Sequence, residues 1–356
     1  MPTARLPGAS PGAVIRDGTA AEVLLENEVN RSGAIQGIQM GDFTRRSSIT
    51  FFSRIAGLVL GAATSIIIAR LLGPEGKGIY TLCSIFPLFI VTFLNLGIAP
   101  ATAYHLASGN CRPREVAGNN LIISLFVGLA GIASGALIIL CLRNSFFPSI
   151  APGLLFLSLA IIIPSLAFSY LQSVFLGLQN FRQYNLAAVI RSGFFTVLTA
   201  GSLLILGTGV EGVIISSALA WLAADFFLAG RIRKHIGPFL FKLRGSYPVD
   251  IIKYGFQVHL GNVFNFLNHR VDMFILNWFL GAAAVGFYSI SVLLVEQLWL
   301  VSSAASLVLF PRVAAEKDGK KRKEFTPVVF RSVLVLTVIG AVLLLAFGRP
   351  LIMLLF

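Results

Sequence analysis

Long apolar runs recur along the chain from about residue 49, and short polar segments separate them. Two of these stretches, 116–142 and 150–179, contain no charged residue. A helix needs about 20 apolar residues to cross a bilayer, and lipid-exposed backbone must pair its own N–H and C=O groups. The pattern therefore predicts an all-α polytopic membrane protein with nine membrane helices, near residues 49–72, 79–106, 117–142, 150–178, 185–206, 212–230, 252–280, 282–310 and 328–347.

The composition between and before these runs divides the chain into four regions. Residues 1–48 are rich in Pro, Gly, Ala and polar residues and lack the apolar core of a signal peptide, so we expect a disordered cytoplasmic tail. Residues 49–230 hold six apolar runs and predict an N-terminal six-helix lobe. A basic cytoplasmic linker follows at 231–251. Residues 252–356 predict a partial C-terminal lobe, with three runs and a stub too short to span.

Charged residues are few, and their distribution is uneven. They make up only 12% of the chain, against roughly 25% in soluble domains, yet the net charge is +13. Alternate loops hold most of the basic residues, at Arg112, Arg114, Arg182, Arg231, Arg233, Lys234, Lys242, Arg244, Arg312 and 317–323. By the positive-inside rule these loops and the N-terminus lie in the cytoplasm. The opposite loops carry little besides Arg70, Lys77, Arg143 and Arg349. Clustering in loops accounts for the positive charge without nucleic acid.

Two parts of the chain resemble each other at an offset of 208 residues (280 − 72). Residues 72–80 (LGPEGKGIY) recur as 280–288 (LGAAAVGFY), each between two predicted membrane helices on the exterior side. Pro100 and Pro311 then stand near the cytoplasmic end of the following helix in each copy. Both copies have the same orientation, so we predict a parallel internal repeat related by an axis along the membrane normal.

The stretch 52–80, with FSRIAG at its start and ARLLGPEGKGIY at its end, resembles the beginning of Wzx-type polysaccharide flippases. These belong to the multidrug/oligosaccharidyl-lipid/polysaccharide (MOP) exporter superfamily. The resemblance covers residues 49–356 and implies two six-helix lobes around a central cavity, with the second lobe incomplete here. It implies export of a polyprenyl-diphosphate-linked oligosaccharide by alternating access. The implied location is the bacterial cytoplasmic (inner) membrane, and the implied pathway makes cell-surface polysaccharide such as lipopolysaccharide.

Polar residues at membrane depth are the candidates for function. A charged group at a helix centre costs about 2.5–3.5 kcal/mol on insertion scales, so it faces protein or water. The densest set recurs at three- and four-residue steps within the run 252–280 and shares an arc of roughly 80°, at Asn262, Asn265, His269 and Asp272. This polar stripe predicts a hydrated cavity, and an interhelical hydrogen-bond seam is the alternative. His259 we interpret as a core histidine.

The remaining candidates are ionisable groups around this stripe. Arg270 stands about 200° around the helix from Asp272, so we expect it to reach the cavity edge or an acid on a neighbouring helix, with Glu296 as the obvious partner. Glu296 itself pairs with an arginine or binds a coupling proton. Arg54 and Arg191 either line the cavity or extend to the cytoplasmic surface from within two turns of a helix end.

Motif matches elsewhere indicate packing rather than catalysis. Residues 207–212 (GTGVEG) lie in a turn between membrane helices and not after a strand, so they do not predict a dinucleotide site. Small residues four apart, at Gly57 and Gly61 and at Gly131 and Gly135, predict close helix contacts. We find no nucleophile–base arrangement, Walker motif or metal-ligand spacing, and we expect no enzymatic activity, cofactor or metal site.

Two transport alternatives stay open beside a polysaccharide flippase, namely a multidrug antiporter and a lipid II flippase. A membrane-embedded glycosyl enzyme is disfavoured because the exterior loops are short. The expected partners are a polyprenyl-diphosphate-linked oligosaccharide, membrane lipids and a coupling proton or sodium ion. Arginines outnumber acids among the candidate residues, which favours an anionic substrate.

Overall fold

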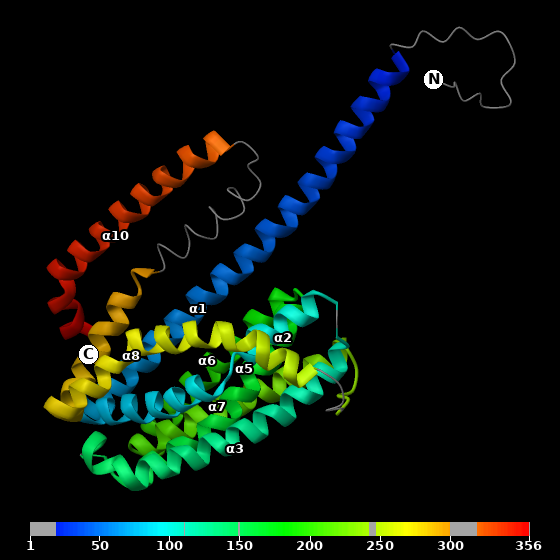
Figure 1. Cartoon of the computed structure of the whole chain (residues 1–356). Helices are drawn as coiled ribbons and strands as arrows, with labels where there is room; N and C mark the ends of the chain where they lie inside the picture. Colours follow the sequence, from blue (N-terminus) through cyan, green and yellow to red (C-terminus); the bar gives the residue numbers. More distant parts are fainter. Residues whose placement is uncertain (1–18, 110, 149, 242–246, 300–318, 356) are drawn as a thin grey trace, which may run out of the picture. The chain divides into compact units, whose positions relative to one another are not determined.

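The computed structural model describes residues 19–109, 111–148, 150–241, 247–299 and 319–355, and these form helices joined by short turns (Figure 1). The chain divides into two units, residues 1–48 and 49–356, and the cavities described below belong to the second. Its helices, α1 included although it begins in the first unit, are α1 (Thr19–Leu94), α2 (Ile98–Ala107), α3 (Pro113–Phe146), α4 (Pro152–Ser158), η1 (Leu159–Ile161), α5 (Ile162–Gly177), α6 (Phe181–Leu204), α7 (Val210–His235), α8 (Tyr247–Glu296) and α10 (Gly319–Leu355).

Seven stretches in the described part of the chain are long and apolar enough to cross a membrane. Two are much longer than one crossing. Ser48–Leu94 has 47 residues and Val258–Glu296 has 39, which at 1.5 Å per residue make about 70 and 58 Å against a bilayer core of about 30 Å. Each bends at a glycine with positive φ, Gly73 in α1 and Gly281 in α8. Ser48–Leu94 is therefore long enough for two crossings that meet at its bend, whereas Val258–Glu296 has a full crossing before its bend and about 22 Å of helix after it.

The two bent helices touch each other just beyond their bends, and the contact is reciprocal. A Cβ atom on Gly78 would collide with the carbonyl oxygen of Ala282, and one on Gly286 would collide with the carbonyl oxygen of Pro74. Residues 74 and 282, and residues 78 and 286, are pairs at the predicted offset of 208. Gly73 (φ 67°, ψ −177°) and Gly281 (φ 78°, ψ 179°) also share one backbone conformation. Both features agree with the repeat, which itself stays a prediction.

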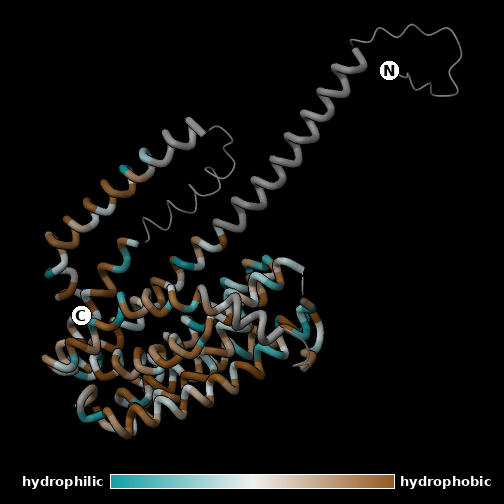
Figure 2. The backbone as a smooth tube through the Cα atoms, viewed as in Figure 1, coloured by the Kyte–Doolittle hydropathy of each residue, from teal (hydrophilic) through white to brown (hydrophobic). Residues whose placement is uncertain are grey.

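The surface of the second unit is apolar, as a lipid solvent requires. Figure 2 shows hydrophobic residues along the outside of its helices. Large side chains such as Leu140, Phe226 and Phe279 are about three-quarters exposed, whereas soluble monomers rarely expose large contiguous apolar patches. Polar residues such as Asn120 and Thr199 are buried instead. The chain is thus a multi-pass membrane protein.

The core of the unit forms where the second half of α1 packs with α5 and α8. Tyr170 and Phe86 are among its fully buried side chains. The predicted close contact at Gly131 and Gly135 is present, since added Cβ atoms there would press on Ile162 and Leu159. The contact predicted at Gly57 and Gly61 was wrong in this conformation, because a Cβ atom at either would meet nothing within 4 Å.

Two predicted helices are interrupted, for identifiable reasons. The run 79–106 breaks between α1 and α2 at Leu96 and Gly97, both with positive φ. Gly97 lies so close to Gly255 of α8 that a side chain would not fit. The run 150–178 is divided by the 3₁₀ turn η1 ahead of Pro164, whose ring removes one backbone donor.

The N-terminal segment and the C-terminal part of the chain differ from the prediction or lie partly outside the described residues. A disordered tail was predicted for 1–48, whereas α1 is helical from Thr19. Residues 20–29 are rich in Ala, Leu and Glu, which are strong helix formers. Residues 1–18, the end of the run 282–310, and Pro311 lie outside the described residues, as does part of the predicted basic linker.

Candidate functional site

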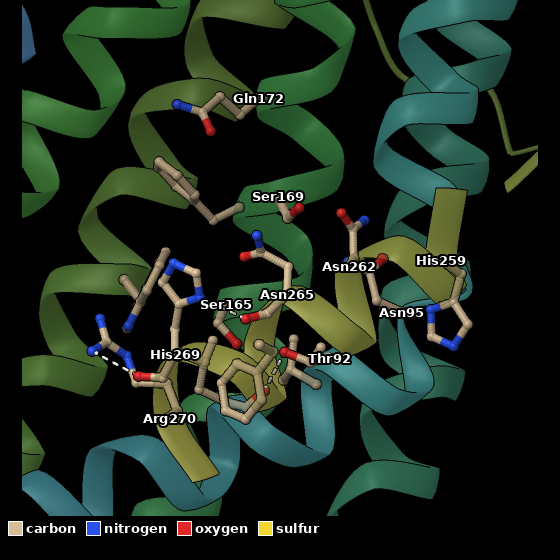
Figure 3. A pocket seen from close by; sticks show the side chains of 15 residues that line it. Thr92, Asn95, Ser165, Ser169, Gln172, His259, Asn262, Asn265, His269 and Arg270 are labelled. Atoms are coloured by element: carbon tan, nitrogen blue, oxygen red, sulfur yellow. Dashed lines mark hydrogen bonds between the residues drawn. The ribbon is translucent and has the colours of Figure 1, made fainter. Parts of the chain in front are cut away.

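A cavity of about 530 Å³ lies among the membrane helices, and most of the predicted polar stripe lines it (Figure 3). We name it the stripe cavity. It is lined from four directions, by Leu88, Val91, Thr92 and Asn95 at the end of α1, Ser165, Phe168, Ser169 and Gln172 of α5, Trp221 of α7, and His259, Asn262, Asn265, Phe266, His269 and Arg270 of α8. The predicted hydrated cavity therefore has a physical counterpart within one unit of the chain.

The wall from α8 has the helical spacing expected from the sequence. Asn262, Asn265 and His269 are three and four residues apart, so they project from one face, and Figure 3 shows all three facing the same space. His269 is bonded through Nδ1 to the carbonyl of Asn265 at 2.9 Å. His259, which we interpreted as a core residue, lines the same cavity and is only 7% exposed.

The opposite wall was not predicted, although its signal is present in the sequence. Ser165, Ser169 and Gln172 are four and three residues apart within an otherwise apolar run, which places them on one face of α5. Asn95 adds an acceptor, because its Oδ1 atom is buried without a hydrogen-bond partner in the described structure. The two walls together present hydroxyl, amide and imidazole groups to one space.

Arg270 and Glu296 form the predicted ion pair. Nη1 of Arg270 lies 2.8 Å from Oε1 of Glu296, and Nη2 lies 3.4 Å from Oε2. The two side chains are 27% and 25% exposed. Arg270 lines the stripe cavity and also a second cavity, which Glu296 lines too. The pair therefore stands where the two cavities adjoin.

Three predicted residues do not line the stripe cavity in this conformation. Arg54 is exposed on α1. Arg191 lies behind the wall, with its guanidinium 4.4 Å from the ring of Trp221. Asp272, expected on the wet face, instead accepts hydrogen bonds from the Tyr288 hydroxyl at 2.6 Å and from the backbone N–H of Met273 at 2.8 Å. It lies near the bend, where the returning half of α8 supplies Tyr288 as its partner.

The second cavity, of about 350 Å³, contains a cation that the sequence analysis assigned to an exterior loop. Lys77 is only 6% exposed and donates to Ser65 Oγ at 2.9 Å. We name this space the Lys77 cavity. Lys77 was missed because it follows the bend of α1 by four residues, within a segment whose Gly and Pro content resembles a loop.

The donor set of the stripe cavity suits a polar organic ligand better than a metal. Its lining includes no Asp or Glu, and no cluster of three His, Cys, Asp or Glu side chains suited to a metal occurs among the described residues. Hydroxyl and amide groups exchange hydrogen bonds with sugar hydroxyls in both directions. Arginine binds phosphate oxygens in a bidentate manner.

Comparison with known proteins places this geometry in a family. The sequence model of the family described as "Polysaccharide biosynthesis protein" matches residues 43–315. An uncharacterized membrane protein of Methanocaldococcus jannaschii is 25% identical over 276 residues, an alignment that covers 72% of this chain and 64% of that protein. The chain therefore spans slightly less than two thirds of that relative's length.

Solved structures show the same fold. An inward-facing multidrug resistance MATE family transporter of the MOP superfamily matches with a TM-score of 0.65 and 19% identity, over 83% of this chain and 71% of that one. Its outward-facing counterpart matches with a TM-score of 0.59 and 19% identity, over 86% of this chain and 70% of that one. A MOP superfamily transporter from Pyrococcus furiosus, whose binding pocket is described as having reverse polarity, matches with 0.62 and 17%, over 88% and 73%. The chain shares the fold of these three solved structures.

The family match covers more than half of the sequence, and the chain belongs to the polysaccharide biosynthesis protein family, with the fold of MOP superfamily transporters.

Proposed function

We propose that this protein exports a polyprenyl-diphosphate-linked oligosaccharide across the cytoplasmic membrane by alternating access. The observation that supports this most directly is the stripe cavity, a polar space without carboxylates inside a membrane protein of the polysaccharide biosynthesis family. We assign Asn262, Asn265 and His269 to the sugar hydroxyls and Arg270 to the diphosphate. The polyprenyl chain stays in the lipid beside the helices.

The lining of the cavity also separates this proposal from its main alternative. A drug antiporter that binds organic cations needs an acid in its cavity, and the stripe cavity has two histidines and an arginine instead. Glu296, at its edge, is engaged by Arg270. A lipid II flippase has the same diphosphate chemistry and differs only in the glycan.

Arg54, Arg191 and Asp272 stay proposed members of the transport path. None lines the cavity in this conformation, and alternating access supplies a second conformation in which each is testable. Arg191 is nearest, because it stacks on Trp221, a residue of the cavity wall. We propose that the N-terminus lies in the cytoplasm, since the basic loops alternate along the chain.

The charge of the substrate sets the energetics of export. Moving one negative charge outward across a negative-inside membrane gains about 2.3 kcal/mol per 100 mV. A diphosphate with about two negative charges therefore gains about 4.6 kcal/mol at 100 mV. The membrane potential by itself drives export, so a coupled proton or sodium ion is not required thermodynamically.

The test is flipping of a fluorescent undecaprenyl-diphosphate-linked sugar by the full chain in proteoliposomes. Replacing Asn265 and His269 by Leu together removes two polar groups of the wall, and we expect the initial rate to fall by at least about 10-fold. Asn144→Leu is the matched control, because Asn144 is an exposed amide on α3 and does not line the cavity. Equal rates for the three proteins contradict the proposal.

The potential is then varied independently of the pH gradient. Collapsing the potential with valinomycin and potassium should slow flipping more than collapsing the pH gradient with nigericin. The reverse order of sensitivity contradicts charge-driven export and favours Glu296 or Asp272 as a proton carrier.

A further inference from the structure

The Lys77 cavity holds a buried cation without a counter-ion. The ion pairs among the described residues are Arg112–Glu115 and Arg270–Glu296, so Lys77 has no carboxylate partner there. Its ammonium donates to Ser65 Oγ at 2.9 Å and lies 5.6 Å from the centroid of the Tyr80 ring. Taking an ammonium out of water is costly unless it is paired and hydrogen-bonded. A single neutral acceptor and one ring face leave this cost largely uncompensated.

The second copy of the predicted repeat has no lysine at the corresponding position. The residue 208 positions after Lys77 is Val285, which is fully buried at the corresponding place beyond the Gly281 bend. Likewise the residue that corresponds to Ser65 is Met273, which is 3% exposed. A hydrophobic pair therefore occupies in α8 the positions that a lysine and a serine occupy in α1. The same frame packs without the buried charge.

Lys77 and the two serines near it have hydrogen-bond donors that are not used within the described structure. An ammonium has three N–H groups, and one of them is used on Ser65. Ser65 accepts that bond, so its own hydroxyl proton is available. Ser84 Oγ, in the same cavity, is buried beside the Tyr80 hydroxyl and makes no hydrogen bond of standard geometry in the described structure. Its counterpart 208 positions later is Val292. The one acid of the lining, Glu296, is engaged by Arg270.

We propose that the Lys77 cavity is a second anion-binding site, which takes a phosphate-type oxyanion through Lys77, Ser65 and Ser84. Lysine binds phosphate as a point charge, and hydroxyl donors complete the coordination of an oxyanion. A volume of about 350 Å³ accommodates a phosphate or diphosphate group. An anion in this site supplies the negative charge that no carboxylate of the described residues gives to Lys77.

The place of this site in transport rests on the proposed function. Arg270 and Leu88 line both cavities, so the two sites adjoin. Lys77 and Thr92 are 15 residues apart on one continuous half of α1, which corresponds to about 22 Å along the helix. On the proposed orientation the Lys77 cavity lies nearer the exterior. It is then the position that receives the diphosphate after Arg270 and before release.

The site itself is tested by binding, without transport. The purified full chain in nanodiscs of neutral lipid is titrated with inorganic pyrophosphate, and the thermal midpoint and the dissociation constant are measured. We expect pyrophosphate to raise the midpoint of the wild type, and Lys77→Val to weaken binding about 10- to 100-fold. Lys77→Arg should keep part of the affinity, whereas Arg70→Ala, an exposed cation near the same bend, should leave it unchanged.

Stability separates a binding lysine from a structural one. Lys77→Val with Ser65→Met transplants the residues of the second copy, and we expect this variant to keep or raise the thermal midpoint without ligand, because it removes a buried charge. A clearly lower midpoint overturns the proposal, since Lys77 is then structural. Unchanged pyrophosphate binding in Lys77→Val overturns it too, as does a wild type that binds no pyrophosphate.

A second titration separates free from lipid-borne phosphate. Nanodiscs that contain a polyprenyl diphosphate should show a midpoint raised over neutral nanodiscs in the wild type and not in Lys77→Val. A response to inorganic pyrophosphate alone keeps the site and assigns it to a soluble anion. In that outcome the proposed export function is tested independently by the variant with Asn265 and His269 replaced, because neither residue lines the Lys77 cavity.

Discussion

The two bent helices, α1 from residue 49 onward and α8, have the same frame and different chemistry. Each bends at a glycine, touches the other at a second glycine five residues later and has a tyrosine two residues beyond, at Gly73, Gly78 and Tyr80 in α1 and at Gly281, Gly286 and Tyr288 in α8. Before the bend, the stripe residues Asn265 and His269 of α8 correspond to the small residues Gly57 and Gly61 of α1, whereas the stripe residue Asn262 corresponds to Arg54. Arg270 corresponds to Ala62.

Beyond the bend each of the two helices has polar residues that the other lacks. Lys77 and Ser84 in α1 correspond to Val285 and Val292 in α8, while Glu296 in α8 corresponds to Leu88 in α1. Features present in both copies are the ones that packing demands. Features present in one copy alone are not demanded by the shared frame. The comparison therefore separates residues that hold the fold from residues that are available for substrate, and it does so within one chain.

The largest effect is expected where the two copies touch. In Gly78→Ala the new Cβ atom collides with the carbonyl of Ala282, a backbone atom that cannot rotate away. We expect a loss of about 3 kcal/mol or more, the upper end of the range for overpacking, and Gly286→Ala should behave alike. Gly57→Ala is the control, because nothing lies within 4 Å of its Cβ position. Thermal midpoints in detergent measure all three.

The thermal midpoints of Gly78→Ala and Gly286→Ala test whether the two helices share one frame. If Gly78→Ala is as stable as Gly57→Ala, the close contact between Gly78 and Ala282 does not contribute to the stability of the protein. If only one of the two contact variants is destabilised, the copies do not share a frame in solution.

A smaller effect is expected at the ion pair, which only the second copy has. Arg270→Ala leaves Glu296 without a partner, and breaking a buried pair costs about 3–5 kcal/mol. Because a quarter of each side chain is exposed, we expect about 2–3 kcal/mol and reduced protein in the membrane. Adding Glu296→Ala should restore the amount of protein, since no unpaired charge is left.

Transport in the double variant then separates two roles of Arg270. Restored abundance with lost flipping supports a substrate ligand, and Arg270→Lys should retain partial flipping. Restored abundance together with restored flipping would falsify the ligand role and leave the arginine as a structural partner of Glu296. Immunoblotting of membranes and accumulation of lipid-linked glycan provide the two measurements.

The repetitive features were predictable from the sequence, and the contacts between helices were not. Apolar runs and three- and four-residue polar steps indicate helices and one wall of a cavity, which is why Asn262, Asn265 and His269 were predicted. The pairing of Arg270 with Glu296 followed from the position of Arg270 around its helix and from charge. The wall from α5 needed knowledge of which helix packs opposite α8. Predicting that Lys77 is buried required knowledge of the bend at Gly73, because a segment rich in Gly and Pro is expected to be a loop and not a helix.

A third effect, smaller again, concerns the tyrosines that both copies share. Tyr288 donates to the carboxylate of Asp272 at 2.6 Å, whereas the residue 208 positions before Asp272 is Thr64, which bonds to Thr196 at 2.7 Å instead. Hydrogen bonds to charged groups contribute about 1.5–3 kcal/mol and neutral ones about 1 kcal/mol. We expect Tyr288→Phe to destabilise by about 1.5 kcal/mol.

Tyr80→Phe completes this comparison. Its hydroxyl has no carboxylate partner within the described structure, so its removal should cost no more than about 1 kcal/mol. Chemical denaturation in detergent resolves the two variants. A larger loss for Tyr80→Phe than for Tyr288→Phe contradicts the assignment of the charged hydrogen bond to the second copy.

The last test perturbs the molecule least and bears on the orientation of both copies. Glu75 and Ala283 correspond to each other, and both are exposed two residues beyond their bends. In a chain whose native cysteines are replaced by serine, Glu75→Cys and Ala283→Cys should both react with an impermeant maleimide added outside intact cells. Native Cys111, kept as the sole cysteine in a third protein, should react only after the membrane is opened, because it lies among basic residues expected in the cytoplasm. Labelling of the two new cysteines from opposite sides makes the repeat inverted rather than parallel. Labelling of both from the inside reverses the orientation, and with it the direction in which the membrane potential drives a diphosphate.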